Sequence, residues 1–267
     1  MTGAARLTAL SRSIAGRTAV VTGAASGMGR AISHLLADEG ARVVIADLGG
    51  DRVGAVVDEI RSVHGDDASL GVVCDVADHA QLEAMVEAAT DWSGAIDIVV
   101  NNAGVSLATS AFQPTAEFED HWARTLDVNL TAHARLIRLA VEHLRAAPGG
   151  GRVVNIASTE AIVTTAGLAA YAATKAGVVG LTKSFAVELG RYGVTVNCIC
   201  PGPIETAMTA DIDAAAKETY ARRRVPLRRY GTPEEVAQMT LSLCLPAASY
   251  VNGAIIPVDG GMSIRHT

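Results

Sequence analysis

The stretch YAATK places a phenol, Tyr171, four residues ahead of an ammonium, Lys175, with only small side chains between them. Four residues are about one helical turn, so in a helix both side chains lie on one face, within reach of a shared third group. To accept a proton at neutral pH, a phenol must lower its pKa by about three units, roughly 4 kcal/mol. An ammonium about 5 Å away contributes roughly 3 kcal/mol of that at an effective dielectric near 20. The pair could therefore be an acid/base site, or a half-buried Tyr beside a solvated Lys.

A glycine-rich stretch, TGAASGMG, follows the first run of β-branched residues and contains Gly23, Gly27 and Gly29. Small residues let the backbone approach a pyrophosphate, and the helix that begins here directs its N-terminal amides and positive dipole end at it. The spacing differs from the G-x-G-x-x-G fingerprint, but the position, between first strand and first helix, is the one a dinucleotide site requires.

Acidic and amide side chains end the next strand-like runs. Asp47 ends the second strand-like run. An acid that binds the adenosine ribose hydroxyls is expected about 20 residues after the glycines, and Asp47 lies close to that position. Asp75 follows the third run, NNAG (101–104) ends the fourth and Ser158 follows the fifth. Turn formation or helix capping is the competing explanation for each.

Strand-like and helix-like segments alternate along the whole chain. Short Val/Ile runs separated by amphipathic stretches, such as 29–40 and 79–92, indicate a parallel sheet covered on both faces. The sequence thus predicts an α/β fold, a single doubly wound, Rossmann-type domain with a seven-stranded parallel sheet and ligands at the carboxyl ends of its strands. The expected strands are 17–22, 41–47, 69–74, 96–101, 151–157, 194–200 and 253–258.

Composition narrows the function classes. The net charge of −6 offers no general attraction to phosphate backbones, so no nucleic-acid partner is expected. No run approaches the roughly 20 apolar residues that span a bilayer, so no membrane association is expected. The four cysteines lie in apolar segments without a C-x-x-C pair, which favours reduced core thiols and no metal site. Residues 1–15 are expected to be a flexible extension ahead of one domain, 16–267.

Taken in order, these motifs resemble the short-chain dehydrogenase/reductase family, from about Arg17 to Gly261. The resemblance is carried by TGAASGMG, Asp75, NNAG, Asn129 in LDVNL, Ser158, YAATK and PGPIET (201–206). Each motif is weak alone, but the ordered set is specific.

The resemblance implies four catalytic residues. Tyr171 would be the acid/base, and Lys175 would lower its pKa and hold the nicotinamide ribose. Ser158 would bind the substrate oxygen, and Asn129 would anchor a water chain to Lys175. In alcohol oxidation the positive nicotinamide ring would help Lys175 to stabilise the phenolate.

The resemblance also implies a cofactor set in which Asp47 favours NAD. Repulsion between its carboxylate and the extra phosphate of NADP predicts at least about 30-fold preference for NAD. Arg52, the nearest basic residue downstream, is expected to turn toward solvent rather than to offer a phosphate partner. The expected cofactor contacts are Gly23, Ser26, Gly27, Met28, Gly29, Asp47, Leu48, Asp75, Val76, Asn102, Ala103, Gly104, Tyr171, Lys175, Pro201, Gly202, Ile204 and Thr206.

The substrate is expected to be a small-molecule secondary alcohol or ketone held by Ser158, Tyr171 and Glu160. Glu160 would bind a polyol hydroxyl or simply be solvated. Five arginines between 222 and 229 would bind an anionic substrate or an acidic carrier protein. Alternatively, they would form a solvated face or a contact between subunits. The alternative activity is that of a 3-oxoacyl-carrier-protein reductase, which Asp47 disfavours. A non-catalytic nucleotide sensor is the other alternative, and the complete catalytic set argues against it.

Family resemblance further implies a homotetramer that packs through the two long helices flanking the fifth strand. A cytoplasmic location is expected as well.

Overall fold

Seven short runs rich in β-branched residues form one parallel sheet in the computed structural model, which describes residues 7–266. The strands occur in the spatial order β3-β2-β1-β4-β5-β6-β7, so the predicted doubly wound, seven-stranded sheet is confirmed. All seven predicted strands are present, with ends shifted by one or two residues. Their bounds are β1 Thr18–Thr22, β2 Arg42–Asp47, β3 Ser69–Val73, β4 Ile98–Asn101, β5 Arg152–Ile156, β6 Thr195–Pro201 and β7 Ile255–Val258.

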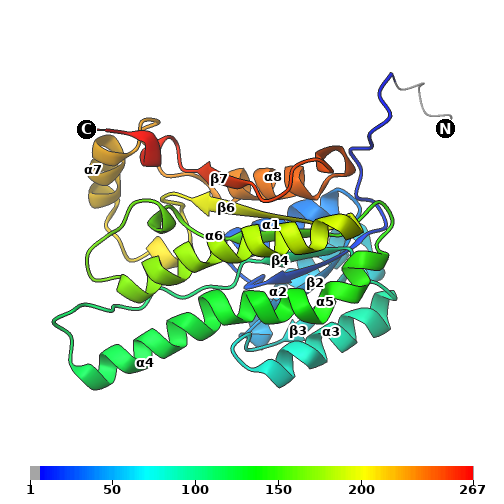
Figure 1. Ribbon diagram of the computed structural model, residues 1–267, viewed down its shortest axis with the longest axis horizontal. Coiled ribbons are helices and arrows are strands. Elements are labelled where there is room, and N and C mark those ends of the chain that lie inside the picture. The colour runs from blue at the N-terminus through cyan, green and yellow to red at the C-terminus, as the bar shows by residue number, and fades with distance from the viewer. Residues whose placement is uncertain (1–6, 267) are drawn as a thin grey trace.

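Helices cover both faces of the sheet (Figure 1). One face packs against α1 Gly27–Asp38, α2 Gly50–His64 and α8 Pro233–Cys244. The other packs against α3 His79–Ser93, α5 Ala132–Ala146 and α6 Ala169–Leu189. Two further helices, α4 Thr115–Leu126 and α7 Ala214–Arg224, extend beyond the sheet toward the site described below.

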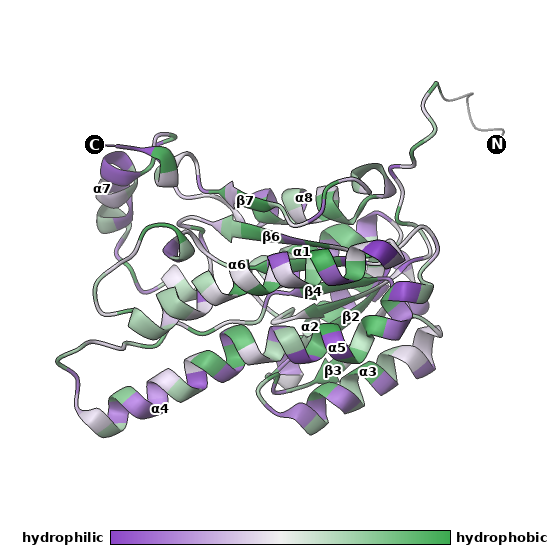
Figure 2. Ribbon diagram, in the orientation of Figure 1, coloured by the Kyte–Doolittle hydropathy of each residue, from purple (hydrophilic) through white to green (hydrophobic). Residues whose placement is uncertain are grey.

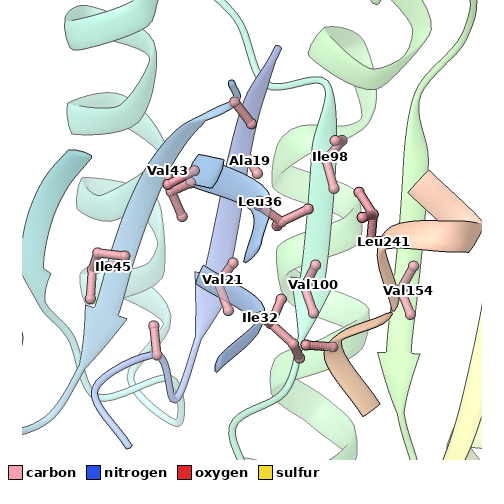
Figure 3. Close-up of a cluster of buried hydrophobic side chains, with 14 of the residues drawn as sticks. Ala19, Val21, Ile32, Leu36, Val43, Ile45, Ile98, Val100, Val154 and Leu241 are labelled. Carbon is pink, nitrogen blue, oxygen red and sulfur yellow. The ribbon is translucent and has the colours of Figure 1, made fainter. Parts of the chain in front are cut away.

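Period-two alternation divides each central strand between two cores. In β1, Ala19 and Val21 face α1 and α8, whereas Val20 faces the opposite layer. The first core is drawn in Figure 3, where Ile32 and Leu36 of α1 lie over β1, β2 and β4. Strands buried on both faces explain why their sequences are nearly continuous hydrophobic runs.

The outermost layers are more polar. Figure 2 shows α7 as largely hydrophilic, while the central strands are largely hydrophobic. Within residues 7–266 no helix is long and apolar enough to cross a membrane. Ile14 is fully buried in the first core, so packing against the domain begins before residue 16, the predicted start of the domain.

Strand order reverses between β1 and β4, and this sets where a ligand can enter. The chain leaves β1 through the glycine-rich loop toward one face and leaves β4 through NNAG toward the other. A crevice opens at such a point, outside the carboxyl ends of the strands.

Candidate active site

Two adjoining cavities at the carboxyl ends of the strands share the side chain of Tyr171. The first, about 260 Å³, runs from the glycine-rich loop past Asp47 to Lys175. The second, about 470 Å³, lies between Ser158 and α7. Tyr171 and Met208 line both cavities. The phenol therefore lies where a molecule bound in one cavity would meet a molecule bound in the other.

The glycine-rich loop has no room for side chains. A Cβ added at Gly29 would lie 2.0 Å from the carbonyl oxygen of Gly23. Gly23 itself has φ +61°, and a Cβ there would lie 2.9 Å from Cα of Ala103. Asn102 fixes the loop by donating its amide to the Thr22 and Gly23 carbonyls, at 2.9 and 3.0 Å. The loop is thus packed closely against Asn102 and Ala103, which follow β4, at the point where α1 begins.

Asp47 organises the adenosine-side end of the first cavity. Its carboxylate accepts hydrogen bonds from the backbone amides of Ala25, at 3.1 Å, and Leu48, at 2.8 Å. Arg52 is turned largely toward solvent as expected, with 63% of its side chain exposed, but its guanidinium also lies 3.2 Å from Oδ1 of Asp47. Arg52 stands in the first turn of α2, and its long side chain reaches back over Gly49, which offers no Cβ to block it.

Asp75 at the end of β3 is paired with a cation that the sequence reasoning missed. Arg124 of α4 donates two hydrogen bonds to the Asp75 carboxylate, at 3.0 and 3.2 Å. Both residues line the first cavity. Arg124 lies nearly 50 positions after Asp75 in the sequence, so spacing does not predict the pair. The one available signal was that Arg124 lies five residues before Asn129 in the same helical stretch.

Most of the predicted cofactor residues line the first cavity. They are Gly23, Ser26, Gly27, Met28, Asp47, Leu48, Asp75, Val76, Asn102, Ala103, Gly104, Tyr171, Lys175 and Thr206. Four predicted residues do not line it. Gly29 and Ile204 are buried, Pro201 ends β6 within the core, and Gly202 lines the second cavity.

Three of the candidates for catalysis, Ser158, Tyr171 and Lys175, line the two adjoining cavities. Tyr171 and Lys175 lie one turn apart near the start of α6, with Nζ of Lys175 5.6 Å from the centre of the phenol ring. Lys175 is buried and donates to the carbonyl oxygen of Ile156 at 2.9 Å. Ser158 follows β5, and its hydroxyl accepts from the backbone amide of Glu160 at 3.1 Å.

The electrostatics of the pair differ from the sequence expectation. Apolar surroundings raise the pKa of Tyr171 above its ordinary value of 10, a hydrogen bond with Ser158 opposes the rise, and the charge of Glu160 adds to it. Burial lowers the pKa of Lys175 to about 8. In the chain alone, therefore, the phenol keeps its proton and the lysine does not by itself produce a phenolate.

Asn129 lies in a single π-helical turn, Asp127–Thr131, which joins α4 to α5 in one continuous helix (Figure 1). The turn directs the Asn129 side chain at Val105, whose backbone amide donates to Oδ1 at 2.8 Å and whose carbonyl accepts from Nδ2 at 2.9 Å. Such turns concentrate at functional sites because they redirect backbone groups. Here the turn places Asn129 against the loop that follows β4.

His133, one turn beyond Asn129, is a buried polar group that sequence reasoning missed. Both ring nitrogens are buried, and among residues 7–266 neither makes a hydrogen bond of regular geometry, although the backbone of Ala103 interacts with the ring and partly opposes the fall in its pKa. Burial, with a contribution from the charge of Lys175, lowers its pKa to about 3. His133 is thus a neutral imidazole close to Lys175.

The second cavity is walled mainly by apolar and aromatic side chains from three segments. Thr159, Glu160 and Leu168 come from the stretch after β5, and Ile212 and Tyr220 come from the region of α7. The remaining part of the wall includes Tyr230, just before α8, and Met262, near the C-terminal end of the described chain.

Neither interpretation offered for Glu160 describes its contacts in full. The carboxylate accepts two hydrogen bonds from Thr165, one from the backbone amide at 2.8 Å and one from the hydroxyl at 2.7 Å. It is therefore fixed at the wall of the cavity rather than freely solvated.

The arginine-rich segment has two of its side chains in ion pairs on the surface. Arg222 pairs with Glu218 at 2.6 Å, one turn earlier in α7. Arg229 forms two hydrogen bonds with Glu235, at 2.8 and 2.6 Å. These contacts support the interpretation of a solvated face.

The four cysteines are free and buried. Among residues 7–266 no group of three or more His, Cys, Asp or Glu is arranged to hold a metal ion.

Comparisons with known proteins agree with this geometry. A family model described as enoyl-(acyl carrier protein) reductase matches residues 23–263. The 3-oxoacyl-(acyl-carrier-protein) reductase FabG of Thermotoga maritima is 37% identical over 249 residues, covering 93% of this chain and 98% of the relative. Trans-4-hydroxycyclohexanecarboxylate dehydrogenase of Sinomonas cyclohexanicum is 37% identical over 252 residues, covering 93% of each chain. The solved structure of a 7α-hydroxysteroid dehydrogenase, complexed with NADH and 7-oxo glycochenodeoxycholic acid, superposes with a TM-score of 0.86 at 32% identity, covering 94% of this chain and 96% of that one.

Proposed function

Because the chain belongs to the short-chain dehydrogenase/reductase family, whose members act on CH–OH and keto groups, we propose that it interconverts a secondary alcohol and a ketone with NAD(H). The observation that carries this proposal is the position of Tyr171, which lines both the cavity of the glycine-rich loop and the cavity of Ser158. A proton donor at the boundary of two binding sites is what hydride transfer between two bound molecules needs.

The first cavity fits a nicotinamide dinucleotide. Its glycine loop excludes side chains where a pyrophosphate would lie, and α1 begins there with free first-turn amides. Asp47 stands where two ribose hydroxyls would donate to it, and Asp75 and Val76 line the far side. When bound, the cofactor supplies the hydride acceptor or donor.

On the protein side, Ser158 and Tyr171 would hold the substrate oxygen. In ketone reduction the phenol of Tyr171 gives its proton to the oxygen, and in alcohol oxidation it takes that proton back. The raised pKa of Tyr171 in the chain alone suits the first role, since the proton is present to be given. For the second, positive charge beside the phenol must lower its pKa, and Lys175 is one turn away.

Lys175 and Asn129 act as positioning residues in this proposal. The Ile156 carbonyl fixes the ammonium, which is still mostly charged at pH 7 with a pKa of about 8. A Cβ on Gly104 would lie 3.4 Å from Oδ1 of Asn129 and 3.5 Å from Nζ of Lys175, so the two polar groups face the same glycine. That shared space is where a proton relay would run.

A second candidate is reduction of a 3-oxoacyl thioester, favoured by the similarity to the Thermotoga maritima reductase. Two features weigh against it. Asp47 disfavours a phosphorylated adenosine ribose, and two of the arginines that would meet a carrier protein, Arg222 and Arg229, are already paired with acids.

The free, buried cysteines suit a reducing compartment, so we propose that the enzyme works in the cytoplasm.

The proposal is tested by assaying alcohols, ketones and acetoacetyl thioesters with each cofactor, following the absorbance of reduced nicotinamide. We expect turnover of a secondary alcohol or its ketone with NAD(H), and a drop of roughly 100-fold or more in Tyr171→Phe with little change in NAD affinity. Tyr192→Phe, which removes an equivalent hydroxyl at the surface, is the control. If Tyr171→Phe kept more than about a tenth of the rate in a chemistry-limited assay, Tyr171 would not be the acid/base.

A further inference from the structure

The wall of the second cavity suits an apolar ring. Tyr220 and Tyr230 meet edge to face, with ring centres 6.2 Å apart and planes at 68°. Met208 and Met262 add polarisable sulfur, and the Tyr220 hydroxyl contacts Sδ of Met262 at 3.8 Å. Aromatic faces and methionine side chains adapt to rings. The volume of about 470 Å³ falls within the range of about 300–1000 Å³ typical of drug-sized ligand sites.

One charge interrupts this wall. Glu160 is the only Asp, Glu, Lys or Arg among the described residues that line the second cavity. Both of its oxygens are engaged by Thr165, so the carboxylate has a fixed position. It lies two residues after Ser158, beside the place where the substrate oxygen would bind.

The charge of Glu160 acts on both sides of the cavity. It raises the pKa of both Tyr171 and Tyr220. Arg224 lowers the pKa of Tyr220, but by less than Glu160 raises it. At the Tyr220 hydroxyl, therefore, the effect of Glu160 is larger than that of Arg224.

Resting on the proposed function, we infer that the second cavity selects uncharged cyclic secondary alcohols and ketones, and that Glu160 excludes ring substrates carrying a carboxylate. A neutral ring gains contact with the two tyrosines and two methionines. A ring with a carboxylate must bring a second negative charge next to one that is held at the cavity wall by Thr165. The cavity thus selects its substrate both by favourable contacts with a neutral ring and by repulsion of a charged one.

The test compares cyclohexanol derivatives that carry either a carboxamide or a carboxylate in the 4-position. The carboxamide and the carboxylate are similar in size and shape, but the carboxylate carries one negative charge and the carboxamide carries none. In the wild type we expect kcat/KM to favour the carboxamide by about tenfold or more, which corresponds to about 1.4 kcal/mol. In Glu160→Gln, which keeps an acceptor for Thr165, the preference should shrink by at least about fivefold. Glu87→Gln, an equal charge change on the exposed side of α3, should leave it unaltered.

A second measurement needs no variant at the site. Cyclohexanecarboxamide and cyclohexanecarboxylate are compared as competitive inhibitors of the wild-type enzyme, and the carboxamide should have the lower inhibition constant by about tenfold. Equal constants, together with equal kcat/KM for the two alcohols, would overturn the role of Glu160 while leaving the alcohol/ketone activity in place. Turnover of open-chain alcohols without any turnover of rings would overturn the ring selectivity. Absence of turnover with every alcohol and ketone would overturn the proposed function itself.

Discussion

The contact between Arg52 and Asp47 changes the expected strength of cofactor discrimination. A guanidinium 3.2 Å from the carboxylate offsets part of its repulsion of a phosphate. The same guanidinium has the fork of donors that suits a phosphate. We therefore expect a preference for NAD of about tenfold, below the 30-fold that Asp47 alone predicts.

Two substitutions separate the contributions of this pair. Arg52→Ala should widen the preference for NAD by about three- to tenfold, because Asp47 is then unopposed. Asp47→Ala should abolish or reverse it, because Arg52 remains. Dissociation constants for NADH and NADPH from nucleotide fluorescence report this directly, with Arg145→Ala as a control on the far end of α5. A wider preference in Asp47→Ala would refute the assignment of the acid to the ribose.

His133 should make the fold sensitive to acid. Its pKa is about 3 in the folded chain against an ordinary 6.5, so below pH 6.5 the unfolded chain binds a proton that the folded chain does not. The stability contributed by the neutral imidazole is complete above pH 6.5 and is lost as the pH falls toward 3. The expected loss is about 1.4 kcal/mol per pH unit in that window.

Urea unfolding between pH 7 and pH 4.5 measures this effect. His133→Phe should unfold with a shallower dependence on pH than the wild type, since the ring that replaces the imidazole does not titrate. His79→Gln, at an exposed position, should follow the wild type. Parallel curves for wild type and His133→Phe would mean that the imidazole is reached by water and ionises in the folded state.

At the scale of elements, the glycine-rich loop depends on one close approach. In Gly29→Ala the new Cβ would lie 2.0 Å from the Gly23 carbonyl, so the loop must move away from the start of α1. We expect affinity for NADH to fall by at least about tenfold, because the amides that would meet the pyrophosphate shift with the loop. Circular dichroism should remain close to that of the wild type.

Gly54→Ala provides the matched control for Gly29→Ala. Gly54 lies in α2, and a Cβ there meets nothing within 4 Å. This variant should bind NADH normally and gain about 0.5–1 kcal/mol of stability, because Ala is a better helix former than Gly. Equal NADH affinity in both variants would show that the loop does not contact the cofactor.

Local patterns predicted the elements better than the contacts between them. The Val/Ile runs of β1 and β4 are buried on both faces, so hydrophobicity alone marks them, and the polar residues after each strand follow from where the strands end. The pairings of Arg52 and Arg124 could not be predicted in this way. They depend on the directions of long side chains, and for Arg124 on how far α4 extends past the end of β3.

The π turn at Asn129 also escaped prediction, for a different reason. The residues Asp127–Thr131 are compatible with an ordinary α-helix, and no Gly or Pro marks an irregularity. The turn is stabilised by tertiary contacts, chiefly the two hydrogen bonds between Asn129 and Val105. Ile14 is similar, since its burial depends on the core it meets rather than on its neighbours in sequence.

For the whole molecule, we expect assembly into a homotetramer through α4, α5 and α6, which lie together on one side of the sheet (Figure 1). Val187 on α6 is 84% exposed in the single chain and lies on a helix that this assembly would bury. Sedimentation should give a mass four times that of the 27.5-kDa chain. Val187→Glu should lower this mass, whereas Val63→Glu, at an exposed valine of α2, should not. A monomeric wild type would contradict the assembly.

The π turn has a genetic consequence. The helix from Thr115 to Ala146 contains one residue more than regular hydrogen bonding would allow, so losing a single codon within Asp127–Thr131 would relieve the irregularity and leave a smooth helix. The residues before and after the turn would keep their positions around the helix axis, because the π turn already absorbs the extra residue, so Arg124 would still face Asp75. The deletion would remove the irregularity that directs Asn129 at Val105, and with it their two hydrogen bonds. A single-codon deletion within α4 or α5 would instead rotate one part of the helix by about 100°, the angle of one residue in a 3.6-residue turn. Screening in-frame codon deletions along residues 115–146 should therefore find variants that fold but have lost activity in this short window, and variants that fail to fold on either side of it.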